Sequence, residues 1–139
     1  MRPPYIPGVT PRPPEGAFDA VKASVHPGMD AGALAASAAL AEGLRLYRDG
    51  YFWECHEVLE AVWMAARDGT PEKAAVQGVI QLANAALKAR MGRPRAVRRL
   101  CGMAETLLAQ AGGPGALPLG LPGAAFAADL ARLRRDSAE

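Results

Sequence analysis

The placement of proline and glycine constrains the fold of this 139-residue chain more than any other feature. Six prolines fall within residues 1–16, namely Pro3, Pro4, Pro7, Pro11, Pro13 and Pro14. Proline fixes φ and removes a backbone donor, so this segment is expected to be an extended arm and not a helix. The turn signal His26-Pro27-Gly28 ends the lead-in that follows. We therefore divide the chain into a proline-rich arm and lead-in, residues 1–29, and a single helical domain, residues 30–139.

Later breaks divide residues 30–139 into five expected helices. The first three cover about 30–49, 51–67 and 71–91. The fourth begins after the Gly92–Pro94 break and ends at about 111, and the fifth begins beyond Pro122 and runs toward the end. Asp30 and Thr70 are placed to cap two of them, and Gly50 suits a left-handed C-cap. Alanine, leucine and arginine dominate the composition, which favours helix. Because the loops are short, we expect an all-α fold, a compact array of about five antiparallel helices with an extended proline-rich N-terminal arm.

Composition and charge indicate an ordinary globular protein. Half of the residues are hydrophobic, 22% are charged, and the formal net charge is +2, as in average globular proteins. The first residues lack a signal-peptide core and no apolar run approaches a membrane span, so we expect a cytoplasmic protein without a membrane partner. Cys55 and Cys101 have no paired spacing, and two free buried thiols are preferred over a disulfide.

The second expected helix carries the most unusual side chains of the chain. At 100° per residue, His56 and Glu60 fall at about 40° and 80°, between Trp63 at about 20° and Met64 at about 120°. Glu54 falls on the remaining, polar arc. Since large apolar side chains flank His56 and Glu60, we expect both to be buried. A buried carboxylate needs a partner, and a histidine one turn away can reach it.

The third expected helix offers further partners. Asn84, Gln77, Lys88 and Gln81 form a polar stripe, which small or apolar residues flank on both sides. If the two helices are antiparallel neighbours, Gln77 and Gln81 can form hydrogen bonds with His56 and Glu60. The expected polar site therefore consists of His56, Glu60, Trp63, Gln77 and Gln81.

These residues also resemble a known family. Residues 51–63, with their aromatic start, and residues 76–84, which begin Val-Gln-Gly, are similar to domain-of-unknown-function family 309. The pattern H-x-x-x-E-x-x-[WY] of these small bacterial and archaeal helical proteins falls on His56, Glu60 and Trp63, and the similarity covers roughly residues 35–105. The resemblance implies a compact multi-helix array and a suspected metal role for the histidine and glutamate. It implies no established reaction.

Three interpretations of the polar site stay open at this point. The first is a site for a divalent metal with His56 and Glu60 as ligands, although two ligands do not hold a metal tightly. A purely structural network that sets the pairing of the two helices is the second. An enzyme with Glu60 as base and His56 as acid is the third, and no nucleophile or phosphate loop supports it. Whether the protein is an enzyme is left undecided.

A second feature is a basic segment between residues 88 and 99, within a stretch from 73 to 104 that contains no acid. Its members are Lys88, Arg90, Arg93, Arg95, Arg98 and Arg99. They fit an acidic partner, and the absence of interleaved aromatic residues argues against nucleic acid. A solvated basic corner opposite an acidic one is the preferred interpretation. Preceding acidic residues also allow homo-oligomers through head-to-tail contacts. The sequence thus predicts a protein of unknown activity with a buried His/Glu/Gln polar site, and it leaves metal binding at that site open. The alternative is a helical interaction module in which the His/Glu cluster is purely structural and the basic segment, residues 88–99, contacts an acidic partner or nucleic acid.

Overall fold

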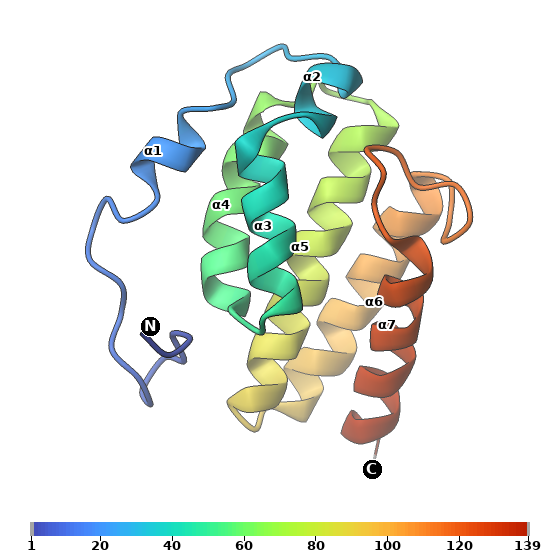
Figure 1. Ribbon diagram of the computed structural model, residues 1–139. Helices are drawn as coiled ribbons and strands as arrows, with labels where there is room; N and C mark the ends of the chain where they lie inside the picture. Colours follow the sequence, from blue (N-terminus) through green and yellow to red (C-terminus); the bar gives the residue numbers. More distant parts are fainter. Residues whose placement is uncertain (1, 139) are drawn as a thin grey trace.

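The computed structural model describes residues 2–138, which form seven α-helices and no strand (Figure 1). The helices are α1 (Asp19–Lys22), α2 (Ala31–Ala35), α3 (Ala38–Arg48), α4 (Phe52–Ala65), α5 (Pro71–Arg90), α6 (Pro94–Gln110) and α7 (Gly123–Ser137). The expected all-α class is confirmed. None of these helices, within the described residues, is long and apolar enough to cross a membrane.

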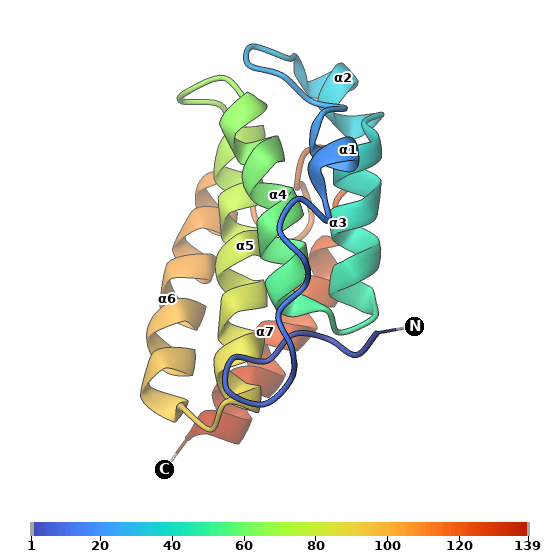
Figure 2. The ribbon, with the colours of Figure 1, turned by 90° about the vertical axis from the view of Figure 1, so that its left-hand side faces the viewer.

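The five longer helices form an antiparallel bundle. From α3 to α7, each helix runs opposite to the one before it, and α3, α4, α5 and α6 lie side by side (Figures 1 and 2). Helix α7 packs against α6 and α5 and also reaches α3, where the rings of Tyr47 and Phe126 meet edge to face at 5.2 Å. The Tyr47 hydroxyl also donates a hydrogen bond to Asp129 on α7 at 2.7 Å. The core between the helices consists mainly of leucine, valine and alanine, as the composition predicts.

Helix ends follow the expected capping chemistry with one exception. Asp30 accepts a hydrogen bond from the Ala33 amide, Thr70 accepts one from the Lys73 amide, and Gly50 has a φ of +84°. The exception is the helix expected over residues 30–49, which is two helices, α2 and α3. Buried Ser37 separates them, because its hydroxyl caps α3 at the Leu40 amide and donates to the Leu34 carbonyl.

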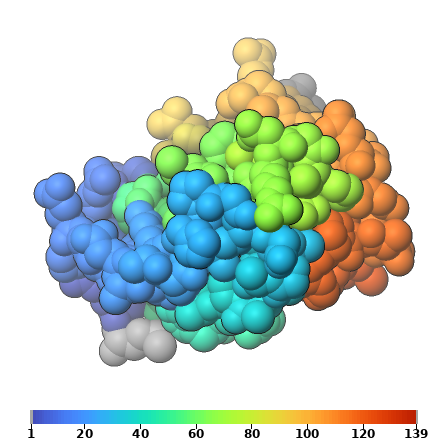
Figure 3. All heavy atoms as spheres, turned by 90° about the horizontal axis from the view of Figure 1, so that it is seen from above, coloured from blue at the N-terminus to red at the C-terminus, as the bar shows by residue number. Residues whose placement is uncertain are grey.

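The proline-rich arm lies along α4 (Figure 2). The Tyr5 ring meets Trp53 edge to face at 5.0 Å, and the Tyr51 hydroxyl donates to the Arg2 carbonyl. Helix α1, in the lead-in, contacts both α3 and α4. Seen from the α2 end, the arm and the loop between α6 and α7 lie on opposite sides of the molecule (Figure 3). The arm therefore covers one flank of the bundle and leaves the α6–α7 side open.

Candidate functional site

The predicted histidine–glutamate pair lies at the surface of α4. His56 Nε2 is 3.5 Å from Glu60 Oε2, so the two side chains meet across one helical turn. The side chain of His56 is 23% exposed, but that of Glu60 is 55% exposed, and the prediction of a buried pair is wrong for Glu60. The physical reason is that Met64, expected to shield Glu60, is itself 63% exposed, and Trp63 is half-buried. Flanking apolar side chains do not bury a residue unless another element covers them.

His56 is held mainly by its own helix. Its Nδ1 lies 3.0 Å from the Trp53 carbonyl oxygen, which accepts a hydrogen bond when Nδ1 carries a proton. Nε2 then faces Glu60 and, at 4.0 Å, Glu57, and becomes a donor to them when the ring is protonated. Glu57 is also paired with Lys22 of α1 at 3.1 Å. The arrangement is an open cluster of surface charges that links α1 to α4.

The predicted hydrogen bonds from α5 are not formed. Gln77 and Gln81 are both half-buried, and within residues 2–138 neither bonds to His56 or Glu60. Gln81 Oε1 instead lies 3.5 Å from Asn84 Nδ2, one turn further along the same helix. The polar stripe of α5 exists, but its side chains are half-buried along the edge of the helix and form no hydrogen bond with α4 among the described residues. The network inferred from the sequence is therefore wrong.

Trp63 lines a shallow cleft where α4, α5 and α6 come together. The cleft, of about 290 Å³, also contains Gln77, Leu107 and Gln110. Lys73 Nζ lies 4.3 Å from the centre of the Trp63 ring, a cation–π contact. Trp63 Nε1 is buried without a hydrogen-bond partner among the described residues. Gln77 thus shares a surface with Trp63, and of the five predicted site residues these two are brought together in a hollow.

The side chains around His56 do not fit a metal site. Tight sites in proteins supply at least three ligands in a compact set. Among residues 2–138 no group of three or more histidine, cysteine, aspartate or glutamate side chains is arranged to hold an ion. Glu57, the second carboxylate near His56, is paired with Lys22. His26 is exposed, and its ring nitrogen lies near its neighbour Pro27. No step is assigned to a metal here.

The basic segment occupies the corner where α5 ends and α6 begins, and we call Lys88, Arg90, Arg93, Arg95, Arg98 and Arg99 the basic corner. Two members have structural contacts. Arg90 donates to the Gly50 carbonyl and lies over the Phe52 ring, and Arg98 donates to the Ser137 carbonyl. The other arginines are exposed. The structure thus separates two anchoring arginines from the rest of the corner.

One buried acid was missed by the sequence analysis. Glu54 was placed on the polar arc of its helix, yet it is only 2% exposed. Its Oε2 accepts a hydrogen bond from the Tyr5 amide at 2.9 Å, whereas Oε1 is buried without a partner among the described residues. The arm covers this arc of α4. The apolar Tyr5 and Ile6 within the proline-rich segment were the available signal, because they indicate an arm that packs on the domain.

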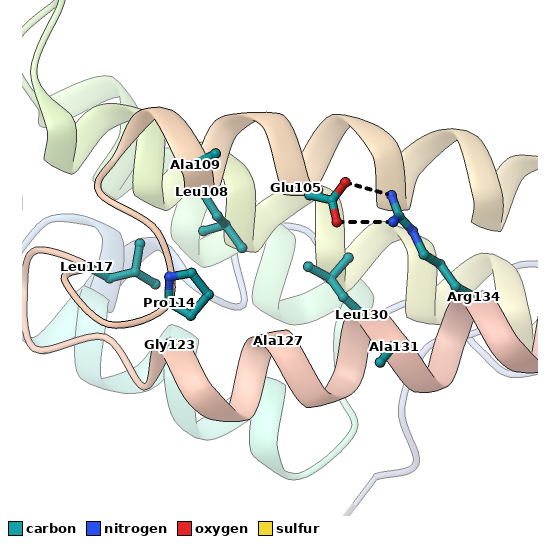
Figure 4. Close-up of a pocket in the computed structure, with 10 residues that line it drawn as sticks. All are labelled: Glu105, Leu108, Ala109, Pro114, Leu117, Gly123, Ala127, Leu130, Ala131 and Arg134. Carbon is teal, nitrogen blue, oxygen red and sulfur yellow. Dashed lines mark hydrogen bonds and ion pairs between the residues drawn. The ribbon is translucent and has the colours of Figure 1, made fainter.

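A mainly apolar cleft lies elsewhere, between α6 and α7 (Figure 4). It measures about 420 Å³, and small residues such as Ala109, Ala127 and Ala131 line it. Arg134 spans its mouth and binds both carboxylate oxygens of Glu105, at 3.0 and 3.3 Å. These two charged side chains satisfy each other, and the other described residues that line the cleft have apolar side chains or none.

Comparison with known proteins finds a family match in the middle of the chain. Residues 40–100 match the family model described as a domain of unknown function, DUF309. This segment runs from α3 to the start of α6, and contains the His56 cluster, the α5 stripe and the basic corner. No curated protein and no solved structure matches the chain. Residues 40–100 of this chain are therefore similar to the DUF309 family, a family of unknown function.

Proposed function

We propose that this protein is a helical interaction module that binds an acidic segment of a protein partner through the basic corner. The observation that carries the proposal is the charge at the start of α6. A helix N-terminus bears a partial positive charge, so acidic residues stabilise it and basic ones do not. The first turn of α6 contains no acid, and its N-cap residue Arg93 makes no side-chain cap. Arg95 and Arg99 follow within the first two turns.

This arrangement costs helix stability, and an anion supplied by a partner would remove the cost. The exposed Arg93, Arg95 and Arg99 form no ion pair with another residue of the described chain. Arginines on other helices, such as Arg45 and Arg134, are paired with carboxylates. The basic corner therefore has an excess of positive charge directed at solvent.

An acidic protein fits the corner better than nucleic acid. No aromatic ring lies among residues 88–99 to stack on a base. The net charge of +2 gives the whole molecule little long-range attraction for a polyanion. In this proposal the His56–Glu60 cluster is architectural, because its bonds run to Trp53, within α4, and through Glu57 to α1.

The test is a titration of the full chain against a fluorescent peptide rich in aspartate and glutamate, followed by anisotropy. The double variant Arg95→Ala/Arg99→Ala should weaken binding by at least about tenfold at low salt, and the difference should shrink as salt screens the charges. The matched control Arg67→Ala/Arg132→Ala removes the same charge from other surfaces and should change affinity less than about twofold.

Two outcomes would overturn the proposal. Equal weakening by both double variants would show a response to net charge and not to the corner. Tighter binding of a single-stranded oligonucleotide than of the peptide, lost in Arg95→Ala/Arg99→Ala, would assign the corner to nucleic acid.

A further inference from the structure

A second cleft lies on the opposite flank, between the proline-rich arm and the bundle. It measures about 340 Å³, within the range of small-molecule sites in proteins. The arm forms one wall, with Pro13, Pro14 and Phe18, and α3 and the start of α4 form the other, with Leu46 and Glu54. In Figure 2 the arm runs in front of α4 at this flank. Neither the His56 cluster nor the basic corner contributes to it.

The wall of this cleft contains the buried acid Glu54. Glu54 is 98% covered, and its Oε1 has no donor among residues 2–138. A buried acceptor without a donor is costly, and more so when it carries charge. Its other oxygen is held by the Tyr5 amide at 2.9 Å, which orients the carboxylate. Since the last torsion of a glutamate side chain is soft, Oε1 can turn toward a donor in the cleft.

The two charged side chains that α3 contributes to the cleft, Glu42 and Arg45, are already paired. Arg45 binds both oxygens of Glu42, at 2.7 and 2.8 Å, and also Asp49 at 3.1 Å. The hydrogen bond from Arg45 lowers the pKa of Glu42, so this pair stays ionised at neutral pH. Glu54 is consequently the acceptor available to an incoming molecule, among walls that are otherwise mostly proline, aromatic and aliphatic.

We propose that this cleft binds a small ligand that carries a protonated amine on an apolar body. The ammonium group would donate to Glu54 Oε1, and the apolar body would lie against Pro14, Phe18 and Leu46. A carboxylate ligand of the same shape is repelled by Glu54. A neutral apolar ligand leaves Oε1 unpaired. The cleft therefore selects for positive charge as well as for shape.

The experiment titrates the full chain with 2-phenylethylamine and follows amide chemical shifts by NMR. The probes 2-phenylethanol and 3-phenylpropionate have a similar shape without the positive charge. The amine should bind at least about tenfold more tightly than either, with shifts at Phe18, Leu46 and Glu54. Glu54→Gln should abolish this preference, and Glu57→Gln, a more exposed acid on the same helix, should leave it unchanged.

A second variant guards against a folding defect in Glu54→Gln. Ala17→Phe fills the cleft from the arm side without touching Glu54, and should weaken all three probes while the melting temperature stays close to that of the parent. Equal affinity for the amine and the carboxylate would overturn the proposal. Amine binding that appears only in Arg2→Ala would also overturn it, because the guanidinium of Arg2, which lines the same cleft, would then be the natural partner of Glu54.

Discussion

At the scale of single residues, burial decides the chemistry of this protein more than residue type does. Glu54 and Glu60 are two turns apart on α4, yet the first is 2% exposed and the second has a side chain that is 55% exposed. Burial also sets the pKa of the two cysteine thiols. Cys55 and Cys101 are both free and fully buried, and burial raises the pKa of each.

Stability should therefore fall with rising pH above about 8.5, the ordinary pKa of a thiol in the unfolded chain. Below that pH both states keep the proton. Above it, the unfolded state loses the proton first and is favoured, by up to about 1.4 kcal/mol per pH unit for each thiol. Urea unfolding at pH 8, 9 and 9.5 under reducing conditions measures this slope. Cys55→Ala should flatten it, and an unchanged slope in that variant would contradict the assignment.

At the scale of elements, close contacts at helix ends determine how the helices join. The loop after α6 returns so tightly that a Cβ on Gly123, the first residue of α7, would overlap the Pro114 carbonyl. Gly102, within α6, has nothing near the position of a Cβ. Both glycines are helical, so intrinsic propensity alone would favour alanine at either one.

The two substitutions should consequently have opposite signs. Gly123→Ala should lower the free energy of unfolding by about 1–3 kcal/mol, because a backbone carbonyl cannot yield as a side chain can. Gly102→Ala should raise it by about 0.5–1 kcal/mol. Urea denaturation of both variants provides the measurement. A stabilising Gly123→Ala would mean that the loop from 111 to 122 adopts another path.

At the scale of the whole molecule, the bundle depends on its closure by α7. Phe126 is 1% exposed and packs against Tyr47 of α3, which lies about eighty residues earlier in the chain. This contact joins the DUF309 segment, residues 40–100, to a helix outside it. The last helix is thus an integral part of the fold.

Truncation of this side chain tests that conclusion. Phe126→Ala should cost about 3–5 kcal/mol, a large part of the stability of a domain of this size. Met103→Ala, on the exposed side of α6, should stay within about 0.5 kcal/mol of the parent. Thermal unfolding followed by circular dichroism compares the two. Similar melting temperatures would show that α7 is dispensable for the bundle.

The local sequence by itself determined the longer helices and most of their ends, whereas the short α1 lies in a segment where no helix was predicted. Asp30, Thr70 and Gly50 cap where expected, because capping depends on side chains within a few residues of the helix end. Ser37 was the exception among them, since a serine within an alanine-rich run can either continue a helix or cap a new one.

Only the tertiary structure decided which polar side chains are buried. Helical projection places residues around one axis and contains no information about what covers each side. The proline-rich arm covers Glu54, whereas the side chain of Glu60 stays 55% exposed and the polar stripe of α5 stays half-buried. Burial is a property of two surfaces in contact, and the partner surface here is a segment about fifty residues earlier in the chain.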